Sequence, residues 1–139
     1  MTLHRSIGPV SHALIDYVFA VLIAIAPRVI GFDGRQATWC YLFAALLLLL
    51  ALATRYPLGV FRVVGFISHG VVELVLAVVL IALPWLAGFW AGVLSRNFYV
   101  GMGVLMLGVW ALTDFRNVRS GGRAIAPKPA APPARPPTP

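Results

Sequence analysis

Two histidine–acid pairs are the residues of this 139-residue chain whose types and spacing could do chemistry. His12 precedes Asp16 by four residues, and His69 precedes Glu73 by four residues. Residues at this spacing lie on one face of a helix, so each histidine can interact with the acid that follows it. Both pairs fall within apolar runs, where an ionisable side chain usually faces a partner or a cavity.

Several uses fit these four side chains. In the favoured interpretation they hydrogen-bond one another and fix the register of two helices, so the protein is of a structural or accessory type and needs no cofactor. A metal ion bound by His12, Asp16, His69 and Glu73 is an alternative, because imidazole and carboxylate suit zinc, iron or manganese. Ligation of haem b by the two histidines is a further alternative. A proton or ion relay also fits, since intramembrane acids and histidines are common relay elements.

The sequence carries no motif that identifies an enzyme. It has no Ser/His/Asp triad, phosphate-binding glycine loop or CxxC pair, and the glycines of Gly101-Met102-Gly103 lie inside an apolar run. The single cysteine, Cys40, cannot form an intramolecular disulfide or a thiolate metal site, and it is predicted to be a small buried hydrophobe. We therefore expect a protein without enzymatic activity.

The composition indicates which elements must position the four polar residues. Hydrophobic residues make up 60% of the chain and charged residues 11%, whereas soluble domains carry about 25% charged residues. Four apolar runs approach the roughly 20 residues that a membrane-crossing helix needs. They cover Ile7–Ile30, Ala37–Ala53, Val63–Leu86 and Phe98–Leu112, the last being short unless neighbouring residues extend it. The prediction is an all-α, integral membrane four-helix bundle in contact with the lipid bilayer.

The first and third runs are similar to each other at a separation of 57 residues. Between Arg5–Phe32 and Arg62–Phe89, ten of 28 aligned positions are identical, including both histidines and the prolines Pro27 and Pro84. Two tandem copies of a helix pair, about 5–55 and 62–115, would have the same orientation and be related by a pseudo-twofold axis along the membrane normal. The four polar residues would then meet at the seam of helices 1 and 3. The two prolines are predicted to end or kink these helices.

The distribution of basic residues predicts the orientation. With both termini in the cytoplasm, eight Lys and Arg residues lie inside and three outside, as the positive-inside rule expects. The net charge of +7 therefore reflects topology, and no nucleic acid partner is expected. Residues 1–119 form the predicted four-transmembrane domain, and residues 120–139 a disordered, Pro/Ala-rich cytoplasmic tail. Other membrane subunits or a second copy of the chain remain open as partners.

An acid, then an apolar stretch, then a proline near an aromatic residue resembles the SPW repeat integral membrane domain family. That family is named for a Ser-Pro-Trp at the end of the first helix of a two-helix unit. The corresponding triplets here are Ala26-Pro27-Arg28 and Leu83-Pro84-Trp85, so the second keeps Pro-Trp and neither has the serine. The resemblance spans about residues 5–115. It implies a multi-pass protein of the bacterial inner membrane whose function is uncharacterised.

Overall fold

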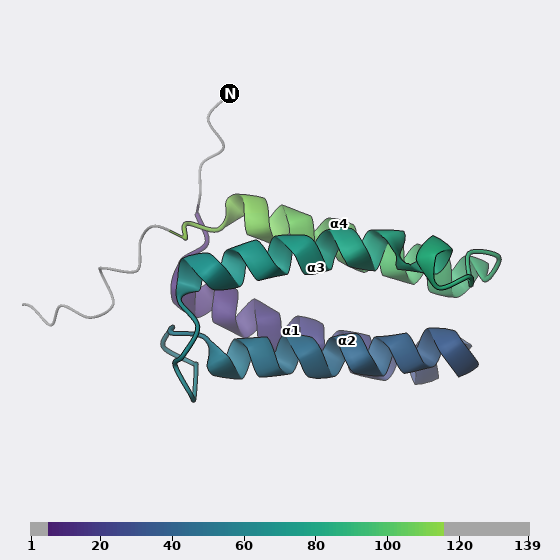
Figure 1. Cartoon of the computed structure of the whole chain (residues 1–139), viewed down its shortest axis with the longest axis horizontal. Coiled ribbons are helices and arrows are strands. Elements are labelled where there is room, and N and C mark those ends of the chain that lie inside the picture. The colour runs from purple at the N-terminus through teal and green to yellow at the C-terminus, as the bar shows by residue number, and fades with distance from the viewer. Residues whose placement is uncertain (1–5, 116–139) are drawn as a thin grey trace, which may run out of the picture.

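The computed structural model describes residues 6–115 and contains four long helices (Figure 1). Helix α1 spans Pro9–Ala26 and is followed by a π-helical turn, Pro27–Gly31; α2 spans Gly34–Ala53, α3 spans Phe66–Leu86 and α4 spans Val93–Leu112. The predicted all-α four-helix bundle is confirmed. The segment Val93–Asn97 supplies the length that the fourth apolar run lacked. The predicted disordered tail, residues 120–139, lies outside the described residues.

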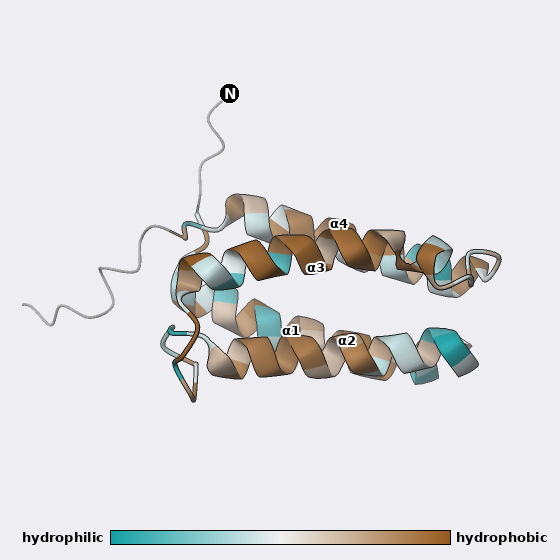
Figure 2. Cartoon of the chain, viewed as in Figure 1, coloured by the Kyte–Doolittle hydropathy of each residue, from teal (hydrophilic) through white to brown (hydrophobic). Residues whose placement is uncertain are grey.

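All four helices are long and apolar enough to cross a membrane. Their outward faces carry large apolar side chains that are more than half exposed, such as Leu14 and Val21 in α1 and Val71 and Val78 in α3. Hydrophobic residues cover most of each helix, and hydrophilic ones are concentrated near the ends (Figure 2). Such a surface is costly in water and suits the hydrocarbon of a bilayer.

The helices form two hairpins, α1–α2 and α3–α4, in which α1 and α3 run in the same direction (Figure 1). Two short parallel bridges close the same end of the bundle. Ile7, just before α1, pairs with Thr113 after α4, and Val64, just before α3, pairs with Thr54 after α2. This end therefore collects the start of α1, the end of α4 and the connection between α2 and α3.

Equivalent positions are buried in the two hairpins. Every buried residue of α1 has a buried counterpart 57 positions later in α3. These pairs are His12/His69, Ala13/Gly70, Asp16/Glu73, Phe19/Leu76, Ala20/Ala77, Ile23/Leu80 and Ala26/Leu83. The shared pattern places the two histidines, and the two acids, at matching levels of parallel helices.

The second helices correspond as well, but at a separation of 59. The buried pairs of α2 and α4 include Cys40/Tyr99, Phe43/Met102, Ala44/Gly103 and Leu47/Met106. The chain that joins equivalent buried positions is thus two residues longer between α3 and α4 than between α1 and α2. An alignment held at 57 places α2 and α4 out of register, which hides their relationship in the sequence.

The two prolines act differently. Pro27 directly follows the last residue of α1 and begins the π-helical turn, in which its carbonyl accepts a hydrogen bond from the Phe32 amide. Pro84 lies inside α3, which continues to Leu86. Its own carbonyl accepts a 2.8 Å bond from the amide of Phe89 and so helps to close the end of the helix. The helix end that was expected at Pro84 thus lies two residues further on.

Candidate functional site

The structure brings all four predicted polar residues together between α1 and α3. His12 is fully buried, and Asp16, His69 and Glu73 are 6%, 2% and 1% exposed. Each histidine lies in the first turns of its helix, and each acid lies one turn deeper. The site therefore occupies the end of the bundle that carries the two bridges, on the seam between the hairpins.

Three potential ligand atoms form a compact triangle. The Nε2 atoms of His12 and His69 are 3.2 Å apart. Oε2 of Glu73 lies 3.2 Å from the first of these nitrogens and 3.9 Å from the second. The centre of a triangle with these sides is about 2.0 Å from each atom, and zinc binds imidazole nitrogen at 2.0–2.1 Å and carboxylate oxygen at 2.0–2.2 Å. The geometry can hold a zinc-sized ion with little movement.

The histidines lie closer to the acid of the other helix than to their own. His12 Nε2 is 3.2 Å from Glu73 but 3.5 Å from Asp16. His69 Nε2 is 3.3 Å from Asp16 but 3.9 Å from Glu73. The spacing of four residues places each pair on one face, and the approach of the two helices then favours contacts across the seam. The polar cluster joins the hairpins rather than stabilising each helix separately.

Each histidine is also held through its other ring nitrogen. Nδ1 of His12 lies 2.9 Å from the hydroxyl of Thr113, and Nδ1 of His69 lies 2.8 Å from the hydroxyl of Thr54. Both threonines are fully buried and directly follow the last residue of a helix, α4 and α2 respectively. Each imidazole is thus oriented by a threonine of the opposite hairpin, and both Nε2 atoms face the centre of the site.

The two acids have different hydrogen-bonding environments. The buried hydroxyl of Tyr56 donates a 3.2 Å hydrogen bond to Oδ2 of Asp16. Burial, and then the nearby Asp16 carboxylate, raise the pKa of the Tyr56 phenol, so it remains a donor at physiological pH. Glu73 receives no hydrogen bond from a hydroxyl or amide of residues 6–115, and its Oε2 lies 3.2 Å and 3.9 Å from Nε2 of His12 and His69. The position equivalent to Tyr56 in the second hairpin is Phe115, which has no donor to offer.

Aromatic rings surround the histidines. Phe66 and Phe115 each contact the His12 ring, with centroids 5.4 Å away, and Tyr56 contacts the His69 ring at 5.8 Å. This packing lowers the local dielectric and strengthens any interaction between charges in the site. A buried carboxylate without a hydroxyl or amide donor is correspondingly costly, so Glu73 favours a cationic partner.

Within residues 6–115, the basic groups at ion-pair distance from Asp16 and Glu73 are the two histidines themselves. Two ionised carboxylates carry a charge of −2, which either one divalent cation or two imidazolium protons would neutralise. Two Nε2–H groups facing each other at 3.2 Å would repel, whereas one cation between the nitrogens is attracted by both lone pairs. The arrangement therefore suits a divalent ion.

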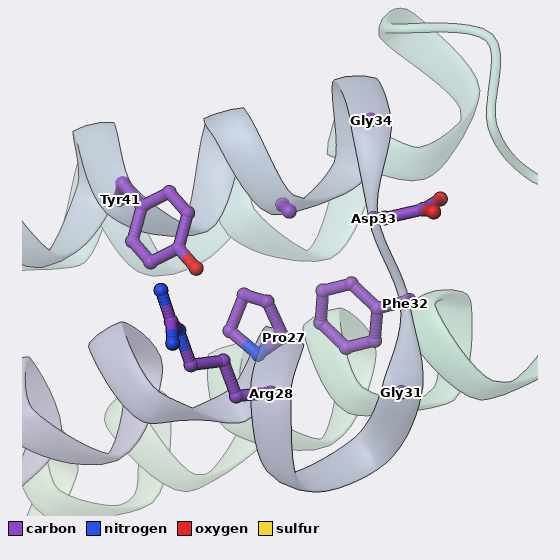
Figure 3. Close-up of a pocket in the computed structure, with 8 residues that line it drawn as sticks. Pro27, Arg28, Gly31, Phe32, Asp33, Gly34 and Tyr41 are labelled. Carbon is purple, nitrogen blue, oxygen red and sulfur yellow. The ribbon is translucent and has the colours of Figure 1, made fainter.

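The rest of the described core offers less chemistry. Cys40 is fully buried, as predicted. A shallow pocket at the opposite end of the bundle lies between the turn after α1 and the first turns of α2, and is lined by residues that include Arg28, Asp33 and Tyr41 (Figure 3). These side chains are on the surface, and Figure 3 shows Arg28 pointing toward Tyr41 rather than into an enclosed cavity.

Thr54, Thr113 and Tyr56 were not predicted from the sequence to belong to the site. A signal was present, because a threonine directly follows each second helix and an aromatic residue, Tyr56 or Phe115, lies two positions after that threonine. These positions correspond at a separation of 59 rather than 57, so an ungapped comparison does not align them. Their role as partners of the histidines also depends on the hairpins crossing at one end, which no local pattern encodes.

Comparisons of the chain with protein-family models, curated proteins and solved structures found no match. The function is therefore inferred from the site.

Proposed function

We propose that this chain is a small multi-pass membrane protein that binds one divalent transition-metal ion, zinc in the first place, between its two helix hairpins. The observation that carries the proposal is the triangle formed by Nε2 of His12, Nε2 of His69 and Oε2 of Glu73. Imidazole and carboxylate are the ligands that zinc shares with iron and manganese. Asp16, 3.3 Å and 3.5 Å from the two nitrogens, is placed to complete the coordination or to balance the charge.

The electrostatics of the seam favour a bound metal ion. They disfavour the alternative in which the seam is apolar and its polar groups are incidental. An acid deep in a membrane helix costs about 2.5–3.5 kcal/mol on insertion scales. Within the described residues, Glu73 meets this cost with no hydroxyl or amide donor, and the two histidines are its neighbours at ion-pair distance. A bound divalent ion would offset the cost and would join ligands from α1 and α3, so the ion acts as a structural link between the hairpins. This role agrees with a structural or accessory protein that has no enzymatic motif.

The other predicted uses of the four residues receive less support. A haem between the two histidines would need a planar macrocycle to separate their Nε2 atoms, and carboxylates of Asp16 and Glu73 already occupy the space around these atoms. A relay would need polar groups that continue across the bundle. Beyond the acids, the described core of α1 and α3 is apolar, with Phe19, Ile23 and Leu80 in sequence toward the other end.

We also propose that the four helices span a bacterial-type inner membrane with both termini in the cytoplasm. Support comes from the four apolar helices of spanning length and from the excess of basic residues on the predicted inner side. The matching buried positions of the two hairpins support a tandem repeat of one helix pair. Membership of the SPW repeat family is a compatible proposal that rests on the motif resemblance.

Metal binding by the purified full-length protein tests the main proposal. The protein is treated with a chelator in detergent, dialysed, and titrated with zinc under calorimetry. Wild type should bind one zinc ion per chain, and Glu73→Gln, which keeps the shape of the side chain but removes a charged ligand, should bind much more weakly. Asp33→Asn is the matched control, because this acid directly precedes α2, at the end of the bundle opposite the site.

One competing arrangement makes a different prediction in the same experiment. The cross-helix distances of 3.2 and 3.3 Å also fit two protonated histidines that each donate to the acid of the other helix. In that arrangement the cluster is a polar clamp, and zinc should bind no better to wild type than to Glu73→Gln. Equal, weak binding by the two proteins would therefore refute the metal-site proposal.

A further inference from the structure

We propose that Thr54 and Thr113 are positioning residues that hold both histidines in the Nδ1–H tautomer and so present the two Nε2 lone pairs to the same point. The part of this inference that concerns zinc affinity rests on the proposed metal site. The part that concerns the tautomer does not, because it follows from hydrogen bonds within the protein.

The position of each hydroxyl proton decides the tautomer. The hydroxyl of Thr54 lies 2.6 Å from the carbonyl oxygen of Leu50, and that of Thr113 lies 2.7 Å from the carbonyl oxygen of Val109. Two oxygens at such a distance need a proton between them, and a carbonyl has none to give. Each hydroxyl therefore donates its single proton to the carbonyl. It can then only accept from the histidine, so Nδ1 must carry a hydrogen.

The ends of the helices explain why the hydroxyls donate in this direction. The last carbonyls of a helix have no intrahelical amide partner and need another donor. The amide of Thr54 bonds to the carbonyl of Ala51, three residues back, at 3.3 Å, and leaves the carbonyl of Leu50 to the hydroxyl. Thr113 repeats this arrangement in α4. Each threonine thus completes its own helix while it accepts from a histidine.

The tautomer decides which nitrogen of each histidine can bind a ligand. A neutral histidine with hydrogen on Nδ1 carries its lone pair on Nε2, which is the nitrogen that faces the other histidine at 3.2 Å. A metal-bound histidine commonly donates its remaining N–H to a fixed acceptor, and this partner sets ring orientation and ligand strength. Here both acceptors belong to the opposite hairpin, so the closure of the bundle and the presentation of both ligands occur together.

A purely structural hydrogen bond would give the same contacts, so the test needs a readout of the tautomer itself. We would label the imidazole nitrogens with ¹⁵N and record NMR spectra of the detergent-solubilised full chain, first free of metal and then with zinc. The neutral rings of His12 and His69 should show hydrogen on Nδ1. Thr54→Val with Thr113→Val removes both acceptors at nearly constant volume, and should mix the two tautomers and weaken zinc binding about 10- to 100-fold.

Two further variants make the experiment specific. Thr54→Ser with Thr113→Ser keeps the hydroxyls and should restore both the spectrum and the zinc affinity of wild type. Thr38→Val is the matched control, because the Thr38 hydroxyl also bonds the carbonyl four residues back, that of Gly34, but lies in the first turns of α2 at the other end of the bundle. It should change neither quantity.

Each outcome bears on the proposal. Hydrogen on Nε2 of both neutral histidines in wild type would overturn it, as would a double valine variant with unchanged tautomers and unchanged affinity. If wild type shows hydrogen on Nδ1 but binds no zinc, the positioning role of the threonines stands and the metal site fails. If the double valine variant does not fold, the wild-type spectrum alone decides, because it reports the tautomer directly.

Discussion

Nε2 of His12 and Nε2 of His69 approach to 3.2 Å, although 56 residues separate the two histidines in the sequence. The contact joins two hairpins that otherwise each pack mainly within themselves. It brings two potential ligands face to face in a buried setting with two carboxylates. What lies between these two atoms therefore decides whether the seam is a metal site or a polar clamp.

Double-mutant cycles should show that the polar cluster couples the hairpins. The interaction energy between His12 and Glu73, at 3.2 Å, should exceed that between His69 and Glu73, at 3.9 Å, although only the second pair lies within one helix. The expected difference is of the order of 0.5–1 kcal/mol, since polar pairs in membrane proteins average about 0.6 kcal/mol and reach about 1.7. Unfolding in mixed micelles by denaturant gives both energies. A larger coupling within the helix would contradict the cross-helix arrangement.

Gly70→Ala should destabilise the protein by about 1–3 kcal/mol, the usual cost of overpacking a core. A Cβ at this position would lie 2.6 Å from the ring of Phe115, which packs against His12. Thermal unfolding in detergent measures the effect. Gly101→Ala is the control, because a Cβ there meets nothing within 4 Å. A Gly70→Ala protein as stable as wild type would mean that the Phe115 ring is not held against His12.

Tyr56→Phe should lower stability at neutral pH by about 1.5–3 kcal/mol, since it removes a hydrogen bond to a carboxylate. The raised pKa of the buried phenol adds a pH dependence. Folding favours the neutral phenol, so its contribution is complete below the unfolded pKa of about 10 and is lost as the pH rises above it. Between pH 9 and 11, wild type should therefore lose more stability than Tyr56→Phe. Parallel alkaline curves for the two proteins would exclude this role.

The proposed orientation predicts which loops meet which side of the membrane. Leu58 and Trp90 are 41% and 56% exposed, in the connections between α2 and α3 and between α3 and α4. Leu58→Cys should react with an impermeant maleimide only after the cells are opened, whereas Trp90→Cys should react in intact cells. The native Cys40 is fully buried and gives a low background. The opposite labelling pattern would place both termini outside.

Much of the fold follows from the sequence because lipid imposes simple rules on it. Continuous apolar runs of spanning length give helices, and the likeness of residues 5–32 to 62–89 predicts that His12 and His69 occupy equivalent places. The pairing of each histidine with an acid was predicted within one helix. The closer contacts lie across the seam, since they depend on the approach of α1 and α3, which a one-dimensional pattern does not contain.

The partners of the histidines were harder to predict. Thr54 and Thr113 are short polar residues at helix ends, where threonine is common for local reasons, and their shared register is hidden by two extra residues in the second hairpin. Tyr56 follows α2 in a connection whose path is set by tertiary contacts. Such residues can be recognised as parts of a site only from the three-dimensional position of the opposite hairpin.

X-ray absorption at the zinc edge of the zinc-loaded, full-length protein reports whether a metal ion lies between the two histidines. We expect one zinc per chain with only nitrogen and oxygen neighbours at about 2.0–2.2 Å, at least two of them imidazole, and loss of this signal in His12→Gln with His69→Gln. A wild-type protein that retains no zinc after dialysis, or a double variant with the same zinc content and spectrum as wild type, would contradict it.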